Sequence, residues 1–317
     1  MRVKPRPASS LASWGWLAIP IAAAVLVLHY RLASGAGYPL DDSWIHLAFA
    51  RHLAHGEGFG VNAGQGSTGS TSPLWTLLLV PGLLIGAGHR VWPWLLGMLA
   101  LAGTGLAAAR VVRRLLALRG ETEGSWATTA PILGGLLAVT SAGLVWSAAG
   151  AMETPLFTLF LLLAWSEQLN DHARASDGGR RLPSWGILAG LATLARPEGL
   201  IFVVLLALCA RSVRAAILNL VVALAVYAPY GIYCLAQTGR FWPSTLFAKT
   251  TRAFAGLPDA GYLLKSLGLI VQLMPALVVL LGAGLLLWAI GALATRHPAA
   301  PRSGRWVRWP TMPAAPA

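Results

Sequence analysis

The stretch YPLDDSWIHLAFARHLAHGEGFG (residues 38–60) follows the first long apolar segment of the chain, which covers residues 11–29. It places two carboxylates, Asp41 and Asp42, side by side in a protein of 317 residues that contains only 11 Asp and Glu. A helix that begins at Trp44 needs one capping residue, and Asp42 suits that position. Asp41 then has no structural role, so the acidic pair is a candidate functional site.

The composition is that of a polytopic membrane protein. The chain is 56% hydrophobic and contains 14 Trp, and its mean hydropathy is +0.64, which excludes an ordinary soluble domain. We attribute the formal charge of +13 to basic cytoplasmic loops rather than to nucleic-acid binding. Cys209 and Cys234 lie in separate apolar runs, so they predict neither a metal site nor a disulfide framework.

The apolar segments predict an all-α fold, a polytopic transmembrane helical bundle. A crossing helix needs roughly 20 mostly apolar residues, and we expect residues 73–88 to form instead a re-entrant or interfacial helix. Two further segments are too short to cross singly, so they predict a pair of short helices that meet at Arg196-Pro197-Glu198. The apolar segments are 11–29, 73–88, 91–110, 130–148, 154–169, 185–195, 198–210, 214–235 and 267–292.

The chain is expected to divide into three regions. Residues 1–10 form a cytoplasmic N-terminus. Residues 11–294 form one transmembrane module with an external loop at 33–72. Residues 295–317 form a disordered cytoplasmic tail that is rich in Pro, Ala, Arg and Trp.

The basic residues orient this bundle. If 73–88 returns to the side on which it starts, sixteen of the 24 Lys and Arg lie on the cytoplasmic side, as the positive-inside rule requires. These sixteen are Arg2, Lys4, Arg6, Arg110, Arg113, Arg114, Arg119, Arg174, Arg180, Arg181, Arg211, Arg214, Arg296, Arg302, Arg305 and Arg308.

Five polar motifs then fall on the outer face, which indicates a single external site. They are LDDSW (40–44), GEGFGVNAGQGSTGSTSPLW (56–75), AMETP (151–155), ARPEG (195–199) and FWPSTLFAKT (241–250).

The first of these motifs opens a helix that we expect to lie in the membrane interface. Ile45, Phe49 and Leu53 would form its apolar face, with Arg51 opposite. The histidines at 46, 52 and 55 are interpreted as interfacial polar residues, because their spacing does not predict a metal site. At the end of the glycine-rich loop, Ser72 is predicted to be the N-cap of a helix whose first turn contains Pro73.

Several charged residues in the later motifs have structural alternatives. Glu153 and Glu198 each stand near the start of a helix, where a carboxylate is favourable. Arg196 can form a structural ion pair with Glu198 or act at the site, since an unpaired ionisable residue at membrane depth is costly. Lys249 suits an interfacial lysine whose amine reaches the headgroups.

In this order, the motifs resemble those of the GT-C superfamily of membrane glycosyltransferases, over residues 15–295. The likeness is to bacterial arabinofuranosyltransferases of cell-wall synthesis and, more distantly, to protein mannosyltransferases. The first external loop of that group is similar to DDSWIHLAFARHLAHGEGFGVNAGQGSTGSTSPLW (41–75). Its later signatures resemble SAAGAMETPLF (147–157), LATLARPEGL (191–200) and FWPSTLFAKT (241–250).

The resemblance implies a glycosyltransferase of the bacterial inner (plasma) membrane, with its active site facing the periplasm or exterior. The donor would be a polyprenyl-phosphate sugar and the acceptor a hydroxyl of a glycan, lipid or protein; the bilayer is a partner, and no nucleic acid is expected. Asp41 would be the general base beside Asp42, a role that suits adjacent carboxylates because their repulsion favours proton uptake. Donor or substrate contacts are assigned to Arg51, Asn62, Ser72, Trp75, Glu153, Arg196, Glu198, Thr245 and Lys249.

Three alternatives stay open. The cofactor is unknown: a divalent cation at Asp41, Asp42 and Glu153 is chemically feasible, but no pattern indicates one. A membrane transporter or lipid-carrier translocase also needs embedded charges, although a transporter would place them near the midplane. A truncated, inactive relative of the glycosyltransferases is the third reading.

Overall fold

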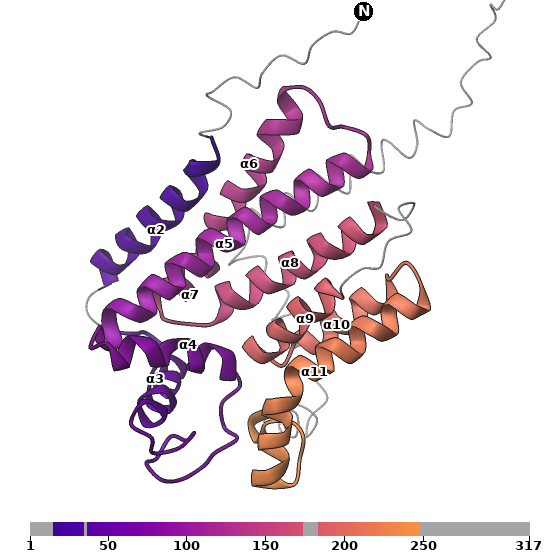
Figure 1. Cartoon of the computed structure of the whole chain (residues 1–317). Helices are drawn as coiled ribbons and strands as arrows, with labels where there is room; N and C mark the ends of the chain where they lie inside the picture. The colour runs from indigo at the N-terminus through magenta and orange to yellow at the C-terminus, as the bar shows by residue number, and fades with distance from the viewer. Residues whose placement is uncertain (1–14, 35–36, 174–182, 247–317) are drawn as a thin grey trace, which may run out of the picture. The chain divides into compact units, whose positions relative to one another are not determined.

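The computed structural model describes residues 15–34, 37–173 and 183–246, which belong to one unit, Met1–Thr251. Every regular element in these ranges is helical, and no strand occurs in them. The elements are η1 (Gly15–Leu17), α2 (Ala18–Ser34), α3 (Asp41–Ala54), α4 (Pro73–Leu84), α5 (Gly88–Leu118), α6 (Ser125–Val139), α7 (Ala142–Ala149), α8 (Thr154–Ala173), α9 (Ser184–Ala195), α10 (Gly199–Leu208) and α11 (Val213–Thr238) (Figure 1). The predictions for residues 1–10, 267–292 and 295–317 concern residues outside these ranges.

Among the described residues, three helices are long and apolar enough to cross a membrane. They are Gly15–Ser34, which combines η1 and α2, His89–Leu118 within α5, and Val213–Thr238, which is α11. Large apolar side chains stay exposed along them, as a lipid-facing surface requires and a water-facing one disfavours. These side chains include Ile21, Val25, Leu28, Leu99, Leu106, Val221, Leu224 and Ile232.

The shorter helices confirm some predictions and correct others. α4 has 12 residues and is about 18 Å long, so it cannot cross a ~30 Å hydrocarbon core alone. α9 and α10 are the predicted pair of short helices. The apolar segment predicted at 130–148 contains two helices, α6 and α7, which are bent by 56° at the break between them and are long and apolar enough for a membrane span only as a pair.

Glycine allows the helices around α5 to approach closely. A Cβ on Gly105 of α5 would lie 2.5 Å from the Ile19 side chain of α2 and 3.0 Å from the Gly135 carbonyl of α6. A Cβ on Gly97 would lie 2.2 Å from the carbonyl oxygen of Ala148 in α7. Small residues are used in this way to pack helices in membranes, where backbone contact replaces hydrophobic burial. α5 is therefore the central helix against which α2, α6, α7 and α8 pack.

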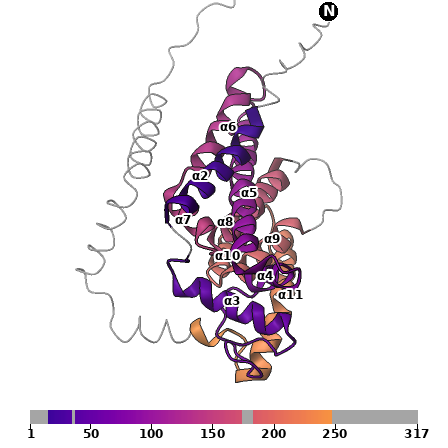
Figure 2. The same ribbon diagram turned by 90° about the vertical axis from the view of Figure 1, so that its left-hand side faces the viewer.

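The first loop and its two helices lie at the end of α5 where that helix begins (Figure 1, Figure 2). α3 packs against α4, and α4 packs against both α5 and α9. The glycine-rich loop between α3 and α4 is held by α11, because Tyr230 Oη donates to the Ser70 carbonyl at 2.6 Å and Tyr233 Oη to the Phe59 carbonyl at 3.0 Å. Ser244 N also donates to the Thr68 carbonyl at 3.2 Å, which brings the FWPST segment to the same loop.

The start of α3 differs from the prediction. The helix begins at Asp41 with Leu40 as its N-cap, so a helix from Trp44 capped by Asp42 is wrong. Its buried face is also different, because Ile45 is exposed and the buried residues are Ser43, His46, Leu47, Phe49 and Ala50. This face points to packing on α4 and on the segment before α8 rather than to an isolated interfacial helix.

The two ends of α5 are expected to lie on opposite sides of the membrane. Asn62 is exposed in the loop between α3 and α4, and Glu121 is exposed just after the end of α5. A 31-residue helix of about 46 Å is longer than the hydrocarbon core is thick. In a background with Cys209 and Cys234 replaced, the variant Asn62→Cys should react in intact cells with an impermeant thiol reagent. Glu121→Cys should react only after the membrane is opened, and labelling of both variants in intact cells would contradict this topology.

Candidate functional site

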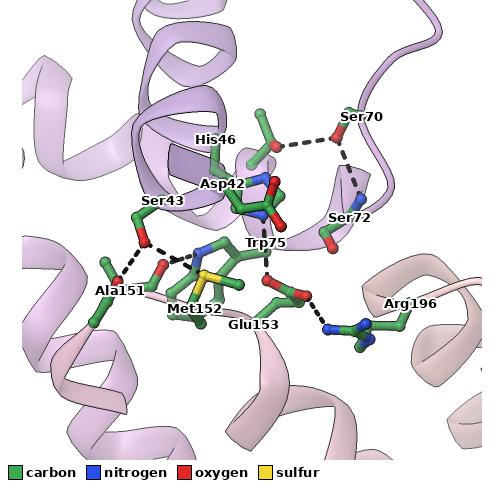
Figure 3. A network of polar contacts seen from close by, with 12 residues as sticks. Asp42, Ser43, His46, Ser70, Ser72, Trp75, Ala151, Met152, Glu153 and Arg196 are labelled. Atoms are coloured by element: carbon green, nitrogen blue, oxygen red, sulfur yellow. Dashed lines mark hydrogen bonds and ion pairs between the residues drawn. The ribbon is translucent and has the colours of Figure 1, made fainter. Parts of the chain in front are cut away.

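A buried ion-pair cluster lies at the end of the bundle that carries the first loop. Glu153 is 2% exposed, and its carboxylate lies next to two basic side chains. Arg196 Nη1 donates to Glu153 Oε1 at 2.6 Å, and His46 Nε2 lies 3.2 Å from Glu153 Oε2 (Figure 3). Arg196 Nη2 also donates to Glu198 Oε1 at 3.1 Å. The cluster thus joins α3, the start of α8 and the α9–α10 turn.

The local sequence explains why Arg196 faces this cluster. Pro197 disfavours a helical backbone at the preceding residue, and Arg196 is accordingly extended, with φ −154° and ψ 136°, at the C-cap of α9. α10 then begins at Gly199, where a Cβ would lie 2.6 Å from the Thr193 amide nitrogen. The Arg-Pro-Glu-Gly sequence therefore ends one short helix, turns the arginine side chain inward and starts the next helix in close contact with the first.

The backbone that carries Glu153 is held in an unfavourable conformation. Ala151 has a φ of 59°, in the left-handed region that non-glycine residues rarely adopt. Two buried side chains fix this turn: Ser43 Oγ donates to the Gly150 carbonyl at 2.6 Å, and Trp75 Nε1 donates to the Ala151 carbonyl at 2.9 Å. Backbone strain of this kind costs about 1–3 kcal/mol and persists only where surrounding contacts determine it. The position of Glu153 is therefore specified by α3 and α4.

The electrostatics of the cluster keep Glu153 ionised. Burial raises the pKa of Glu153, but the adjacent His46 and the charge of Arg196 together outweigh it, so the pKa lies below the usual 4.5. Burial lowers the pKa of Arg196, whereas Glu198 and Glu153 raise it, and the net pKa lies above its usual value. Both partners of the central pair are therefore charged at neutral pH.

The two adjacent aspartates have different surroundings. Both are exposed in the first turn of α3, where a negative charge is favoured by the helix N-terminus. Asp41 Oδ1 accepts a hydrogen bond from the Asp42 amide at 3.0 Å. Within the described residues the Asp42 carboxylate has no hydrogen bond or ion pair, and Asp42 lies one turn before His46 on the same side of α3 (Figure 3).

A group of buried hydroxyls lies beside the ion-pair cluster at the N-terminus of α4. Ser70 Oγ accepts from the Ser72 amide at 3.3 Å and lies 3.5 Å from Thr76 Oγ1. Ser72 is the N-cap of α4, as predicted, but its hydroxyl makes no capping bond. Its Oγ is fully buried and has no partner among the described residues, and the same holds for the buried Thr245 Oγ1. Unpaired buried hydroxyls are uncommon and favour a ligand or water at this position.

An apolar cavity of about 320 Å³ adjoins this group. It lies between α3, α4, α9 and α11, and it includes Pro73, which follows Ser72, and Leu194, which precedes Arg196 by two residues. A hydrocarbon chain matches such a lining, whereas a sugar or a phosphate does not. The complete lining is Leu53, Phe59, Pro73, Leu74, Leu77, Leu194, Val226, Pro229, Tyr230 and Tyr233.

The structure brings together only some of the residues predicted for the site. Trp75, Glu153, Arg196 and Glu198 join the cluster directly or through the Ala151 turn. Arg51 and Asn62 are exposed, and Asn62 donates only to Gln65 in the loop. Lys249 lies outside the described residues. In the described ranges no three His, Cys, Asp or Glu side chains are grouped as metal ligands.

Sequence reasoning missed the role of His46. The residue was interpreted as an interfacial polar side chain, but it is 3% exposed and faces Glu153. A signal was present in its spacing, because His46 follows Asp42 by four residues and Ser43 by three, which places all three on one helix face. The pairing of Arg196 with Glu198 is confirmed, but the buried partner of Arg196 is Glu153.

We expect the two partners of Arg196 to contribute unequally to stability. Arg196→Met removes the partner of a buried carboxylate and should lower the free energy of unfolding by about 3–5 kcal/mol. Glu198→Met removes an exposed partner and should cost at most about 1 kcal/mol. Thermal unfolding of the variants in one detergent provides the comparison, and a larger loss for Glu198→Met would contradict the assignment of Glu153 as the main partner.

No known protein family, curated protein or solved structure matches this chain. Within the described ranges the site combines the Asp42 carboxylate, which has no partner there, a buried and charged Glu-Arg pair, the Ser72 hydroxyl at the start of α4, which also has no partner there, and an apolar cavity that begins at Pro73.

Proposed function

We propose that the protein is a glycosyltransferase that moves a sugar from a polyprenyl-phosphate donor to a hydroxyl of a cell-envelope acceptor, at the outer face of a bacterial plasma membrane. The observation that carries the proposal is the position of the Glu153–Arg196 pair. It lies close to Asp42, and the apolar cavity is lined by Pro73, which follows Ser72, and by Leu194, which precedes Arg196 by two residues. A lipid-linked anionic donor needs this combination of an apolar chain site, a cation and a nearby base.

In the proposed reaction the acceptor oxygen attacks the anomeric carbon of the donor sugar. A bond forms between that oxygen and the anomeric carbon, and the bond from the anomeric carbon to the phosphate oxygen breaks. The acceptor proton passes to a carboxylate, and polyprenyl phosphate leaves as an anion. The protein therefore has to supply a base for the proton and positive charge for the leaving phosphate.

Asp42 is the better candidate for the base. Asp41 accepts a hydrogen bond from the amide of the next residue, a local interaction that stabilises the start of α3. The Asp42 carboxylate has no such partner within the described residues and is exposed on the side of α3 that carries His46. We therefore assign the proton transfer to Asp42 and a local structural role to Asp41, which exchanges the roles expected from the sequence.

Arg196 and the N-terminus of α4 suit the phosphate of the donor. A guanidinium has five N–H donors, and Arg196 uses two of them in its bonds to Glu153 and Glu198. The Ser72 hydroxyl at the N-cap of α4 has no partner among the described residues, α4 packs against α9, the helix that ends at Arg196, and a helix N-terminus favours an anion. Lys249 and Thr245, which the sequence also assigns to the donor, belong to the segment that follows α11.

The apolar cavity suits the first part of the polyprenyl chain. Its position next to Ser72 and close in sequence to Arg196 would let the chain lie among the ten lining residues while the phosphate stays at the charged cluster. The donor would then be held by two kinds of interaction, and the sugar would lie toward the exposed acidic pair.

The proposal is tested by the two aspartates. In detergent, with acceptors from a membrane extract, the parent protein should release polyprenyl phosphate from at least one member of a panel of polyprenyl-phosphate pentoses and hexoses. Asp42→Asn should lower that rate by about 10²- to 10⁴-fold, the usual effect of losing a general base, whereas Asp41→Asn should retain more activity. Glu57→Gln, which changes an exposed carboxylate in the same loop, is the matched control and should act as the parent does.

Failure of the parent to turn over any donor in the panel would overturn the proposed function. Turnover by Asp42→Asn at the parental rate, with loss of activity in Asp41→Asn, would instead show that the base is Asp41.

A further inference from the structure

One backbone turn is bonded to the helices that carry the separate groups of the proposed reaction. This turn, Gly150-Ala151, comes just before Glu153, which holds Arg196. Its two carbonyl groups accept hydrogen bonds from α3, the helix that carries Asp42, and from α4, the helix whose N-terminus is assigned to the phosphate. The position of the base and the position of the cation are therefore coupled through this turn.

The bond from α3 is made by Ser43, the residue that follows Asp42. Ser43 is fully buried, and its Oγ lies 2.6 Å from the Gly150 carbonyl oxygen and 3.3 Å from Met152 Sδ. A hydroxyl has one hydrogen, and a thioether sulfur is a weak acceptor, so the carbonyl is the main partner. Ser43 is the third residue of α3, and its bond holds the first turn of that helix against the segment that leads to Glu153.

The backbone strain at Ala151 indicates that the surrounding helices determine the shape of this turn. Ala151 has a φ of 59°, whereas Gly150, the residue type that adopts such a φ readily, has a φ of −81°. Glycine at position 150 serves close packing instead, because a Cβ there would lie 3.0 Å from the Trp146 carbonyl oxygen. Strained turns that are fixed by buried side chains occur preferentially at functional sites.

We propose that Ser43 is a positioning residue of the transfer reaction, which fixes the Asp42 carboxylate relative to the Glu153–Arg196 pair. The Ser43 hydroxyl touches no reacting atom, because it is buried and bonded to the main chain. It acts on geometry: the base has to reach the acceptor proton while the phosphate leaves toward the guanidinium, and a displacement of 1 Å can slow such a reaction by about 10²-fold. This role rests on the proposed function, in which Asp42 is the base.

Turnover and donor binding are measured separately on the full chain in detergent. Ser43→Ala should lower the rate at saturating donor by about 10- to 100-fold. Its affinity for a short polyprenyl phosphate, measured by thermal stabilisation, should stay within about threefold of the parental value, because no group that touches the donor is removed. The double variant Asp42→Asn/Ser43→Ala should be no slower than Asp42→Asn, because a residue that acts through the base has no further effect once the base is lost.

The matched control is Asn219→Ala. Asn219 is 3% exposed, and its Oδ1 accepts a hydrogen bond from the Gly186 amide at 2.8 Å, in the contact between α9 and α11. Like Ser43, it is a buried polar side chain that joins one helix to the main chain of another segment. Asn219→Ala should therefore lower thermal stability and keep the parental rate of turnover.

The effect of Ser43 on α3 can also be measured without turnover. Ile45 is exposed near the start of α3, and a spin label on Ile45→Cys, with Cys209 and Cys234 replaced, reports the mobility of this part of the helix. The label should be more mobile when Ser43→Ala is added, because the bond to the Gly150 carbonyl is lost. An unchanged spectrum would overturn the inference whether or not a donor has been found.

Parental turnover by Ser43→Ala, or an equal loss of turnover in Asn219→Ala, would also overturn the inference. The same holds for a loss in Ser43→Ala that weaker donor binding explains, and for a double variant slower than Asp42→Asn by the full effect of Ser43→Ala. If Ser43→Ala does not fold, Ser43→Cys, whose thiol is a weaker donor, is judged by the same criteria. A parent that turns over no donor contradicts the proposed function and this role with it, whereas an active parent that is insensitive to Ser43→Ala contradicts only the role of Ser43.

Discussion

The buried carboxylate of Glu153 is the interaction on which the arrangement of this end of the bundle depends. An ionised carboxylate out of water is costly unless it is paired and hydrogen-bonded. Glu153 meets that requirement through a hydrogen-bonded guanidinium from the α9–α10 turn, and an imidazole from α3 lies 3.2 Å from its second oxygen. Three segments that are distant in the sequence must therefore meet in one geometry, and the strained Ala151 turn, held by Ser43 and Trp75, shows that the backbone adapts to it.

This constraint separates the acidic residues into two groups with different uses. Glu153 is buried, paired and ionised, so it positions Arg196 rather than exchanging protons during a reaction. Asp42 is exposed and free of partners within the described residues, which leaves it able to take up a proton. The proposed transfer reaction uses both groups, the buried one to present Arg196 toward a leaving phosphate and the exposed one to accept the proton of the acceptor hydroxyl.

The sequence predicted which residues belong to this site better than it predicted which of them contact one another. Apolar length located most of the helices, and the Arg-Pro-Glu-Gly run predicted the break between α9 and α10, because proline and glycine act locally. Glu153 and Arg196 stood out since charges are rare in an apolar chain. Their mutual pairing was not predictable, because it joins residues 43 positions apart through packing of α8 against α9. The start of α3 was also missed, because the residue that caps a helix depends on single backbone hydrogen bonds. In the structure α3 begins at Asp41, and His46 lies on its buried face.

The central claim, that Glu153 is ionised and stabilised by its partners, is tested most directly by the pH dependence of stability. The measurement is the difference in unfolding free energy between the parent and Glu153→Gln in one detergent, from pH 7 to pH 3. A lowered pKa means that the folded state binds this proton less readily than the unfolded state, so the stabilisation is complete above the usual carboxyl value of 4.5 and is lost as the pH falls below it. We therefore expect the advantage of the parent to be constant near neutral pH and to shrink on acidification below pH 4.5. A difference that stays constant over the whole range, or that grows as the pH falls, would contradict this account.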